Sequence, residues 1–132
     1  MSGRLVYLDT SAFVKLVTPE PETSALVAHL RRRSLAVAAT LLRTEALRAA
    51  SRNSPACLVD TRRALRDLVF IDLSRDVLDQ AGILGPPGLR SLDAVHLAVA
   101  LSLGDDLDEL VTYDARMATA ATGCGLLVSS PA

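Results

Sequence analysis

The chain has 132 residues, enough for one compact domain with its own core, and half of them are hydrophobic. Aromatic residues make up only 3% and tryptophan is absent, so leucine, valine and alanine must fill that core. The formal net charge of −1 excludes a generally basic nucleic-acid binder, and any contact with nucleic acid would depend on local patches.

Short apolar runs alternate with longer helical patterns, and no repeat or linker interrupts them, so we expect a single domain over 1–132. The runs predict strands at 5–8, 35–38, 68–71 and 110–113, with a weaker fifth at 126–128. The segments between them predict helices at 10–18, 22–33, 41–52, 56–67, 75–84, 91–103 and 115–122. The strand runs are continuously apolar, as in strands covered on both faces. We therefore expect an α/β fold, a three-layer α/β/α sandwich around a parallel sheet of four to five strands.

The cysteines and the N-terminal sequence indicate the cellular compartment. Cys57 and Cys124 lack the spacing of a zinc site, and two free thiols in a reducing cytosol are the simpler interpretation. The N-terminus enters the first predicted strand without a signal-peptide pattern, and no apolar stretch approaches the roughly 20 residues of a transmembrane helix. These features predict a cytoplasmic protein that does not contact a membrane.

Three aspartates occupy positions that helix capping alone would explain. Asp9 follows the first predicted strand and Asp114 the fourth, each directly before a helix, where aspartate is a preferred N-cap. Asp93 falls in the first turn of a helix that Ser91 can cap, and a negative charge there suits the helix dipole. Taken one at a time, these positions favour a structural role.

Glu45 is harder to explain by local structure. It lies on or beside the apolar face of its predicted helix, close to Leu41 and Leu42. A carboxylate there is unfavourable unless it is paired or binds a metal. An ion pair with Arg48 or Arg52 and a role as a functional acid are equally compatible with the sequence.

The four acids gain significance as a set. Asp9 and Asp114 follow strands whose carboxyl ends meet at one edge of a parallel sheet, and Glu45 and Asp93 enter the same edge on helices. Capping explains three of these positions separately but does not predict that they converge. Four carboxylates in a small volume repel one another, and a divalent cation removes that penalty. Oxygen ligands alone suit Mg²⁺ or Mn²⁺ better than zinc.

Four segments give the chain a resemblance to the VapC-like PIN domains along nearly its whole length. They are Leu8-Asp9-Thr10-Ser11-Ala12, Arg43-Thr44-Glu45-Ala46-Leu47, Ser91-Leu92-Asp93-Ala94-Val95-His96-Leu97-Ala98 and Val111-Thr112-Tyr113-Asp114-Ala115-Arg116. The resemblance implies a PIN-like sandwich and a Mg²⁺-dependent endoribonuclease, with Mn²⁺ as a substitute, that is the toxin of a toxin–antitoxin pair. It also implies which acids are catalytic and bind the metal: Asp9, Glu45, Asp93 and Asp114.

The resemblance implies further site residues and partners. A hydroxyl near the acids would come from Thr112 or Ser11, and Arg116 would contribute beside them. RNA would be the substrate, a cognate antitoxin protein the partner, and a homodimer the assembly. Arg116, Arg43 and Arg48 are nearest in sequence to the acids and are candidates to hold flanking phosphates.

The remaining charged residues have a structural interpretation. Arg31–Arg33 and the set Arg62, Arg63 and Arg66 are expected on solvated helix faces. His96, one turn after Asp93, is expected to be a partly buried structural histidine and not a general base. His29 is expected to have no constellation of acidic or hydroxyl groups around it and receives no role.

Two other functions compete with the nuclease hypothesis. A phosphoryl-transfer fold could use Asp9 as a nucleophile. Dehalogenase-like phosphatases need a second acid two residues later, where this sequence has Ser11. Receiver domains need an acidic pair after the first strand and a lysine on a late strand, and the one lysine, Lys15, lies too early in the sequence. A non-catalytic RNA- or protein-binding module on the same fold remains open, because fold does not determine function. The complete acid set argues against such a module, which gains nothing from clustered negative charge.

Overall fold

Five strands form one sheet in the order β3-β2-β1-β4-β5 in the computed structural model, which describes residues 4–32 and 35–132. Every neighbouring pair is parallel. The strands are β1 (Leu5–Leu8), β2 (Leu35–Ala39), β3 (Val69–Ile71), β4 (Leu107–Val111) and β5 (Val128–Ser129). The parallel sheet expected from the sequence is therefore confirmed, with five strands.

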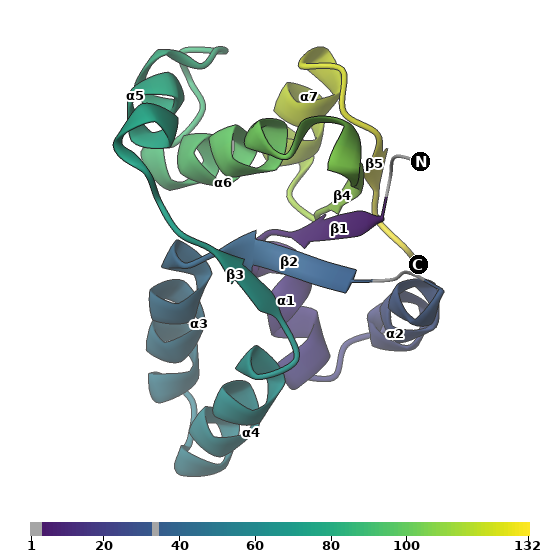
Figure 1. Cartoon of the computed structure of the whole chain (residues 1–132). Helices are drawn as coiled ribbons and strands as arrows, with labels where there is room; N and C mark the ends of the chain where they lie inside the picture. The colour runs from purple at the N-terminus through teal and green to yellow at the C-terminus, as the bar shows by residue number, and fades with distance from the viewer. Residues whose placement is uncertain (1–3, 33–34) are drawn as a thin grey trace.

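Two layers of helices cover the sheet. In Figure 1, α1 to α4 lie on one face and α5 to α7 on the other, which is the expected α/β/α sandwich. Among the described residues, no helix is long and apolar enough to cross a membrane. The helices are α1 (Thr10–Val17), α2 (Thr23–Arg31), α3 (Leu41–Ser51), α4 (Pro55–Leu65), α5 (Arg75–Ile83), α6 (Ser91–Ser102) and α7 (Ala115–Gly123), with a short 3₁₀ turn at Gly104–Asp106.

Successive residues of the central strand β1 face two different cores. Tyr7 packs with Leu97 of α6 and Met117 of α7, while Val6 and Leu8 belong to the core on the opposite face. All three β1 residues have no exposed surface. Burial on both faces explains why this strand has a continuous apolar sequence and no alternation.

The fourth strand differs most from its predicted position. It was expected at 110–113 and runs over Leu107–Val111, so Thr112 follows the strand and does not lie in it. The expectation was wrong because Glu109, a buried acid, interrupts the apolar run. Its carboxylate contacts His29 and lies 3.1 Å from the Ser129 hydroxyl, so His29 does have acidic and hydroxyl neighbours.

Two other expectations concern chain segments beside the sheet. The helix expected over 22–33 ends at Arg31, and the last residue of the expected arginine run, Arg33, lies outside the described residues. Ser91 was expected to cap α6, but Arg90 takes the N-cap position and Ser91 is the first helical residue.

The strand order also locates a crevice. The chain leaves β1 through α1 on one face of the sheet and leaves β4 through α7 on the other (Figure 1). Neighbouring parallel strands whose connections diverge in this way leave a crevice at their carboxyl ends, where ligands bind in open α/β sheets. Asp9 directly follows β1, and Asp114 lies three residues beyond the end of β4.

Candidate active site

Asp9 is the N-cap of α1 and is almost completely buried, with 3% of its surface exposed. Its Oδ1 accepts hydrogen bonds from the Ala12 amide at 3.1 Å and from the Ser11 hydroxyl at 2.6 Å. Its Oδ2 accepts the hydroxyl proton of Thr112. Burial raises the pKa of Asp9, and the hydrogen bonds from Ser11, Thr112 and Ala12 offset only part of that effect.

Two hydroxyl groups join the end of β1 to the end of β4. Thr112 Oγ1, which donates to Asp9, accepts the Asp114 amide at 3.1 Å. Ser11 Oγ accepts the Tyr113 amide at 2.9 Å and lies 3.2 Å from Thr112 Oγ1. The sequence left open whether Thr112 or Ser11 reaches the site, and the structure brings both hydroxyls to the Asp9 carboxylate.

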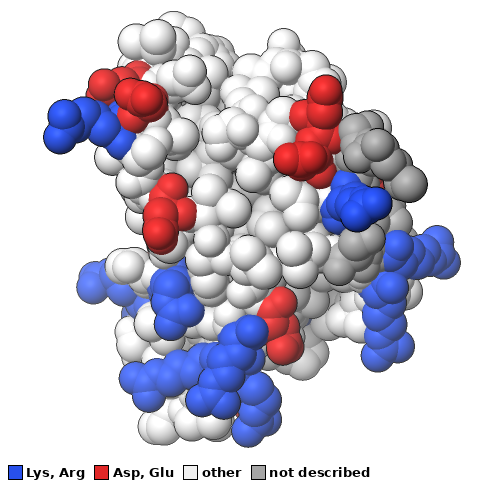
Figure 2. Space-filling view, in the orientation of Figure 1, with Lys and Arg blue, Asp and Glu red and all other residues white. Residues whose placement is uncertain are grey.

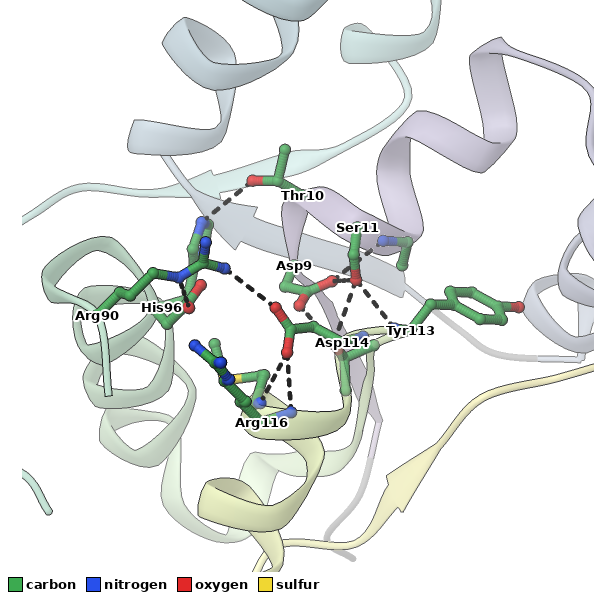
Figure 3. A network of polar contacts seen from close by, with 12 residues as sticks. Asp9, Thr10, Ser11, Arg90, His96, Tyr113, Asp114 and Arg116 are labelled. Atoms are coloured by element: carbon green, nitrogen blue, oxygen red, sulfur yellow. Dashed lines mark hydrogen bonds and ion pairs between the residues drawn. The ribbon is translucent and has the colours of Figure 1, made fainter. Parts of the chain in front are cut away.

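Asp114 and Asp93 share one arginine. Asp114 caps α7, as its Oδ1 accepts the amides of Arg116 at 2.8 Å and Met117 at 3.3 Å. Its Oδ2 accepts a proton from Arg90 Nη2 at 3.1 Å, and Arg90 Nε donates to Asp93 Oδ2 at 3.0 Å. Figure 3 shows the Arg90 guanidinium reaching toward Asp114 across the front of the site.

Arg90 is a site residue that the sequence analysis missed. Its side chain is 66% exposed, and it stands between two acids from different parts of the chain. The sequence signal that could have found it is the three-residue spacing to Asp93, which places the two side chains together at the start of a helix.

Glu45 of α3 has different partners from those expected. Its Oε1 accepts the Thr10 hydroxyl at 2.7 Å and lies 2.7 Å from His96 Nε2. In the described part of the chain neither Arg48 nor Arg52 contacts its carboxylate, so the ion pair on the helix, one of the two interpretations left open by the sequence, is wrong. Although burial acts to raise the pKa of Glu45, the hydrogen bonds from His96 and Thr10 outweigh it and hold the pKa below its ordinary value.

His96 was expected to be a partly buried structural histidine and not a general base, and its degree of burial needs correction. Only 1% of its surface is exposed, and one ring nitrogen faces Glu45 while the other faces the hydroxyl of Tyr7. The sequence analysis missed this contact because Glu45 and His96 are 51 residues apart. Local spacing carries no information on such a pair.

The donors present suit a hard cation. Glu45 and Asp93 line one cavity together with Arg90, and Arg90 shows that a positive charge is held beside Asp93 and Asp114. Within the described residues, Glu45 Oε2 and Asp93 Oδ1 have no hydrogen-bond partner. Carboxylate oxygens are the ligands that Mg²⁺ and Mn²⁺ prefer.

The arrangement is not a ready-made metal centre. No group of three or more His, Cys, Asp or Glu side chains in residues 4–32 and 35–132 is placed to hold a metal ion. Direct ligation by several acids therefore requires side-chain movement. Arg90 can move because its side chain is 66% exposed, and two ion pairs, to Asp93 and Asp114, hold it at the site.

The other expected arginines lie at varying distances from this chemistry. Arg116 is the second residue of α7 and its amide donates to Asp114, whereas the Arg43 guanidinium lies 5.1 Å from the centre of the Phe70 ring. Basic side chains gather over α4 and the adjoining part of α3 (Figure 2). Arg62 and Arg63 of α4 and its C-cap Arg66 are exposed, as expected for a solvated helix face.

Comparisons with known proteins assign the family. The PIN domain family matches residues 6–123. Ribonuclease VapC46 of Mycobacterium tuberculosis is 46% identical over 126 residues, covering 96% of this chain and 97% of that protein. Ribonuclease VapC47 of the same species is 37% identical over 132 residues, covering 96% and 97%.

A solved structure has the same fold at low sequence identity. A toxin–antitoxin complex from Klebsiella pneumoniae contains a chain with a TM-score of 0.74 and 21% identity, over 96% of this chain and 98% of that one. At this identity the match establishes the fold alone, whereas the sequence matches extend over nearly the whole chain. The protein therefore belongs to the PIN-domain family, among the VapC ribonucleases.

Proposed function

We propose that the protein is a Mg²⁺-dependent endoribonuclease that hydrolyses RNA phosphodiester bonds in the cytoplasm as the toxin of a toxin–antitoxin pair. The observation that carries this proposal is the gathering of acids from four separate segments at the carboxyl ends of β1 and β4, with Arg90 between two of them. Helix capping accounts for Asp9 and Asp114 one by one. It does not account for Glu45, or for the burial of Asp9 at a site where its charge is unfavourable.

The site residues have distinct tasks in this proposal. Asp9 and Asp93 would hold the cation, and Glu45 and Asp114 would do so directly or through water. Mg²⁺, or Mn²⁺ in its place, would polarise a phosphoryl oxygen and lower the pKa of the attacking water. The Thr112 hydroxyl would orient the Asp9 carboxylate, because its hydrogen bond holds Oδ2 toward the residue that follows β4.

Arg90 connects the acids to the substrate. Arg90 neutralises Asp93 and Asp114, which would otherwise repel an RNA backbone. Because its side chain is mostly exposed, its guanidinium can exchange a carboxylate for a phosphate once a cation occupies the acids. Arg116 is exposed in the first turn of α7 beside Asp114, and its side chain would contact a neighbouring phosphate.

The partners follow from the relatives and from exposed apolar surface. The K. pneumoniae neighbour is a toxin–antitoxin complex, which supports an antitoxin partner here. Leu78 and Ile83 of α5 and Leu92 of α6 are exposed and offer apolar surface to a second copy of the chain. Light scattering tests the homodimer, and a strict monomer at micromolar concentration would contradict it.

The first experiment maps RNA cleavage. Purified protein without antitoxin is incubated with total bacterial RNA in Mg²⁺ or in EDTA, and new 5′ ends are sequenced. Asp9→Asn removes the central acid, and Asp79→Asn is the matched control, because Asp79 is exposed on α5. We expect discrete ends from wild type and Asp79→Asn in Mg²⁺ only, and none from Asp9→Asn.

Two results would contradict the proposal. Cleavage by Asp9→Asn, or cleavage in EDTA, would remove the metal-binding acids from the reaction. RNA binding by wild type without new ends, and without stabilisation by Mg²⁺ or Mn²⁺, would favour a non-catalytic binding module on the same fold.

A further inference from the structure

A line of hydrogen bonds runs through the core from the backbone of β2 to the Glu45 carboxylate. The Ala39 amide donates to the Tyr7 hydroxyl at 3.2 Å. That hydroxyl lies 2.6 Å from His96 Nδ1, and His96 Nε2 lies 2.7 Å from Glu45 Oε1. The two rings meet edge to face, with centroids 5.9 Å apart at 74°. Ala39, Tyr7 and His96 are buried, so this line of hydrogen bonds reaches solvent at Glu45.

The Ala39 amide determines which group donates and which accepts in each of these hydrogen bonds. Because the Tyr7 oxygen accepts the Ala39 proton, its own proton is free to go to His96 Nδ1. A neutral His96 then carries its proton on Nε2, aimed at Glu45. The opposite direction would leave the Tyr7 proton without an acceptor in a fully buried site, which is unfavourable.

The hydrogen bonds to Glu45 occupy one of its carboxylate oxygens and leave the other unoccupied. Oε1 accepts two hydrogen bonds, one from His96 Nε2 and one from the Thr10 hydroxyl. Oε2 has no hydrogen-bond partner among the described residues, and Glu45 lines the cavity that it shares with Asp93. A glutamate side chain on a helix surface ordinarily samples several rotamers, and two convergent donors remove that freedom.

We propose that Tyr7 and His96 are positioning residues that hold Glu45 with Oε1 occupied and Oε2 presented to a divalent cation. Tyr7 acts through His96, and His96 acts through Glu45. The rigid sheet supplies the fixed end of the chain, because Ala39 closes β2 and Tyr7 lies in the neighbouring strand β1. This inference rests on the metal-dependent nuclease proposed above.

The test compares two single-hydroxyl deletions. Tyr7→Phe removes the hydroxyl in the chain, and Tyr113→Phe is the matched control, since the Tyr113 hydroxyl donates to the Pro131 carbonyl instead. Titration calorimetry measures Mn²⁺ affinity for each full-length protein without RNA. We expect Tyr7→Phe to lower the affinity about tenfold, as loss of an outer-shell partner does, and Tyr113→Phe to leave it unchanged.

Two variants of His96 separate hydrogen bonding from packing. His96→Leu fills the space without donors, and we expect an affinity loss at least as large as that of Tyr7→Phe. The amide of His96→Gln can donate to Glu45 and accept from Tyr7, so we expect it to recover most of the affinity. Equal affinities for Tyr7→Phe and Tyr113→Phe, or for the Leu and Gln variants, would overturn the proposal.

Spectroscopy of the metal-free protein provides a second measurement if His96→Leu fails to fold. The chain has two histidines, so long-range ¹H–¹⁵N correlations can be assigned with His29→Gln. We expect His96 to be protonated on Nε2 and unprotonated on Nδ1, and the reverse tautomer would overturn the proposal.

The outcome for Asp9→Asn distinguishes the two proposals. If Asp9→Asn abolishes Mn²⁺ binding while Tyr7→Phe and His96→Leu bind as wild type does, the metal site stands and the positioning chain is wrong. If wild type itself fails to bind Mn²⁺, both proposals fall.

Discussion

Asp9 and Glu45 are carboxylates of the same candidate site, yet the fold shifts their pKa values in opposite directions. Asp9 receives three hydrogen bonds, more than Glu45, and its pKa is nevertheless raised, because it is 3% exposed. Glu45 receives two, and its pKa is lowered because its side chain keeps 21% of its exposure and faces His96.

The difference shows which effect dominates at each acid. At Asp9 the loss of hydration outweighs the donors of Ser11, Thr112 and Ala12, so the metal-free fold carries an unfavourable charge. At Glu45 the donors outweigh the loss of hydration, so the charge is stabilised without a cation. Asp9 is thus the acid with more to gain from a cation, and Glu45 is the acid already held in place.

The largest effect expected from this comparison is stabilisation by metal. A ligand at 100 times its dissociation constant stabilises a fold by about 2.7 kcal/mol, and we expect wild type to approach this value in saturating Mn²⁺. Asp9→Asn should gain little, because the acid that a cation relieves most is gone. Thermal unfolding with and without Mn²⁺ measures the stabilisation of each protein by the metal. An equal gain in the free energy of unfolding for both proteins would contradict the role given to Asp9.

Asp9→Asn should also stabilise the metal-free protein at neutral pH. Because the folded-state pKa of Asp9 lies above its unfolded value, the folded protein loses stability as pH rises through that window. The amide carries no charge to bury, so we expect Asp9→Asn to increase the free energy of unfolding at pH 7, because burial raises the pKa of the Asp9 carboxyl. Urea unfolding at pH 7 and at pH 3.5 checks the sign: the gain should shrink in acid, and a loss at pH 7 would contradict it.

Glu45→Gln should have the opposite sign. The pKa of Glu45 is depressed by folding, so its stabilisation is present above the unfolded value and is lost as pH falls through the folded value. We expect Glu45→Gln to lower the free energy of unfolding by about 0.5 kcal/mol at pH 7, a small effect because solvent screens a partly exposed pair. In the same urea series, the difference in the free energy of unfolding between wild type and Glu45→Gln should become smaller at acid pH. A Glu45→Gln protein more stable than wild type would contradict the proposed opposite effects of folding on Asp9 and Glu45.

The smallest effect concerns Arg90, which competes with a cation for Asp93 and Asp114. Arg90→Gln should raise Mn²⁺ affinity roughly twofold at low salt, with a smaller gain at high salt. Arg62→Gln on α4 is the control for a change in net charge. Weaker binding by Arg90→Gln alone would show that this arginine supports the cation and does not compete with it.

Several features of the site could be predicted because their causes are local. Asp9 and Asp114 each follow a strand and precede a helix, and both cap their helices as expected. The expectation that acids meet at one edge followed from the parallel sheet, whose strand ends are adjacent. Thr112 was expected near the acids through the family resemblance, and its contact with Asp9 bears out its proximity.

Other features were missed because their causes lie far apart in the chain. Glu45 was weighed against arginines one turn away, but its partners Thr10 and His96 lie 35 and 51 residues away. Glu109 broke the apolar pattern of its strand, and only the position of α2 beside β4 and β5 explains why an acid is buried there next to His29.

The sequence by itself determined the element types, the parallel α/β/α architecture and the residues able to supply oxygen ligands, since hydrophobic periodicity and capping act within one turn or one strand. The tertiary structure alone decided the burial, the hydrogen-bond partners and the orientation of those ligands. Desolvation of Asp9, the Arg90 bridge and the Tyr7–His96–Glu45 chain depend on side chains that approach only when separate segments pack. Electrostatic energies at such contacts depend on distance and burial, which no local pattern encodes.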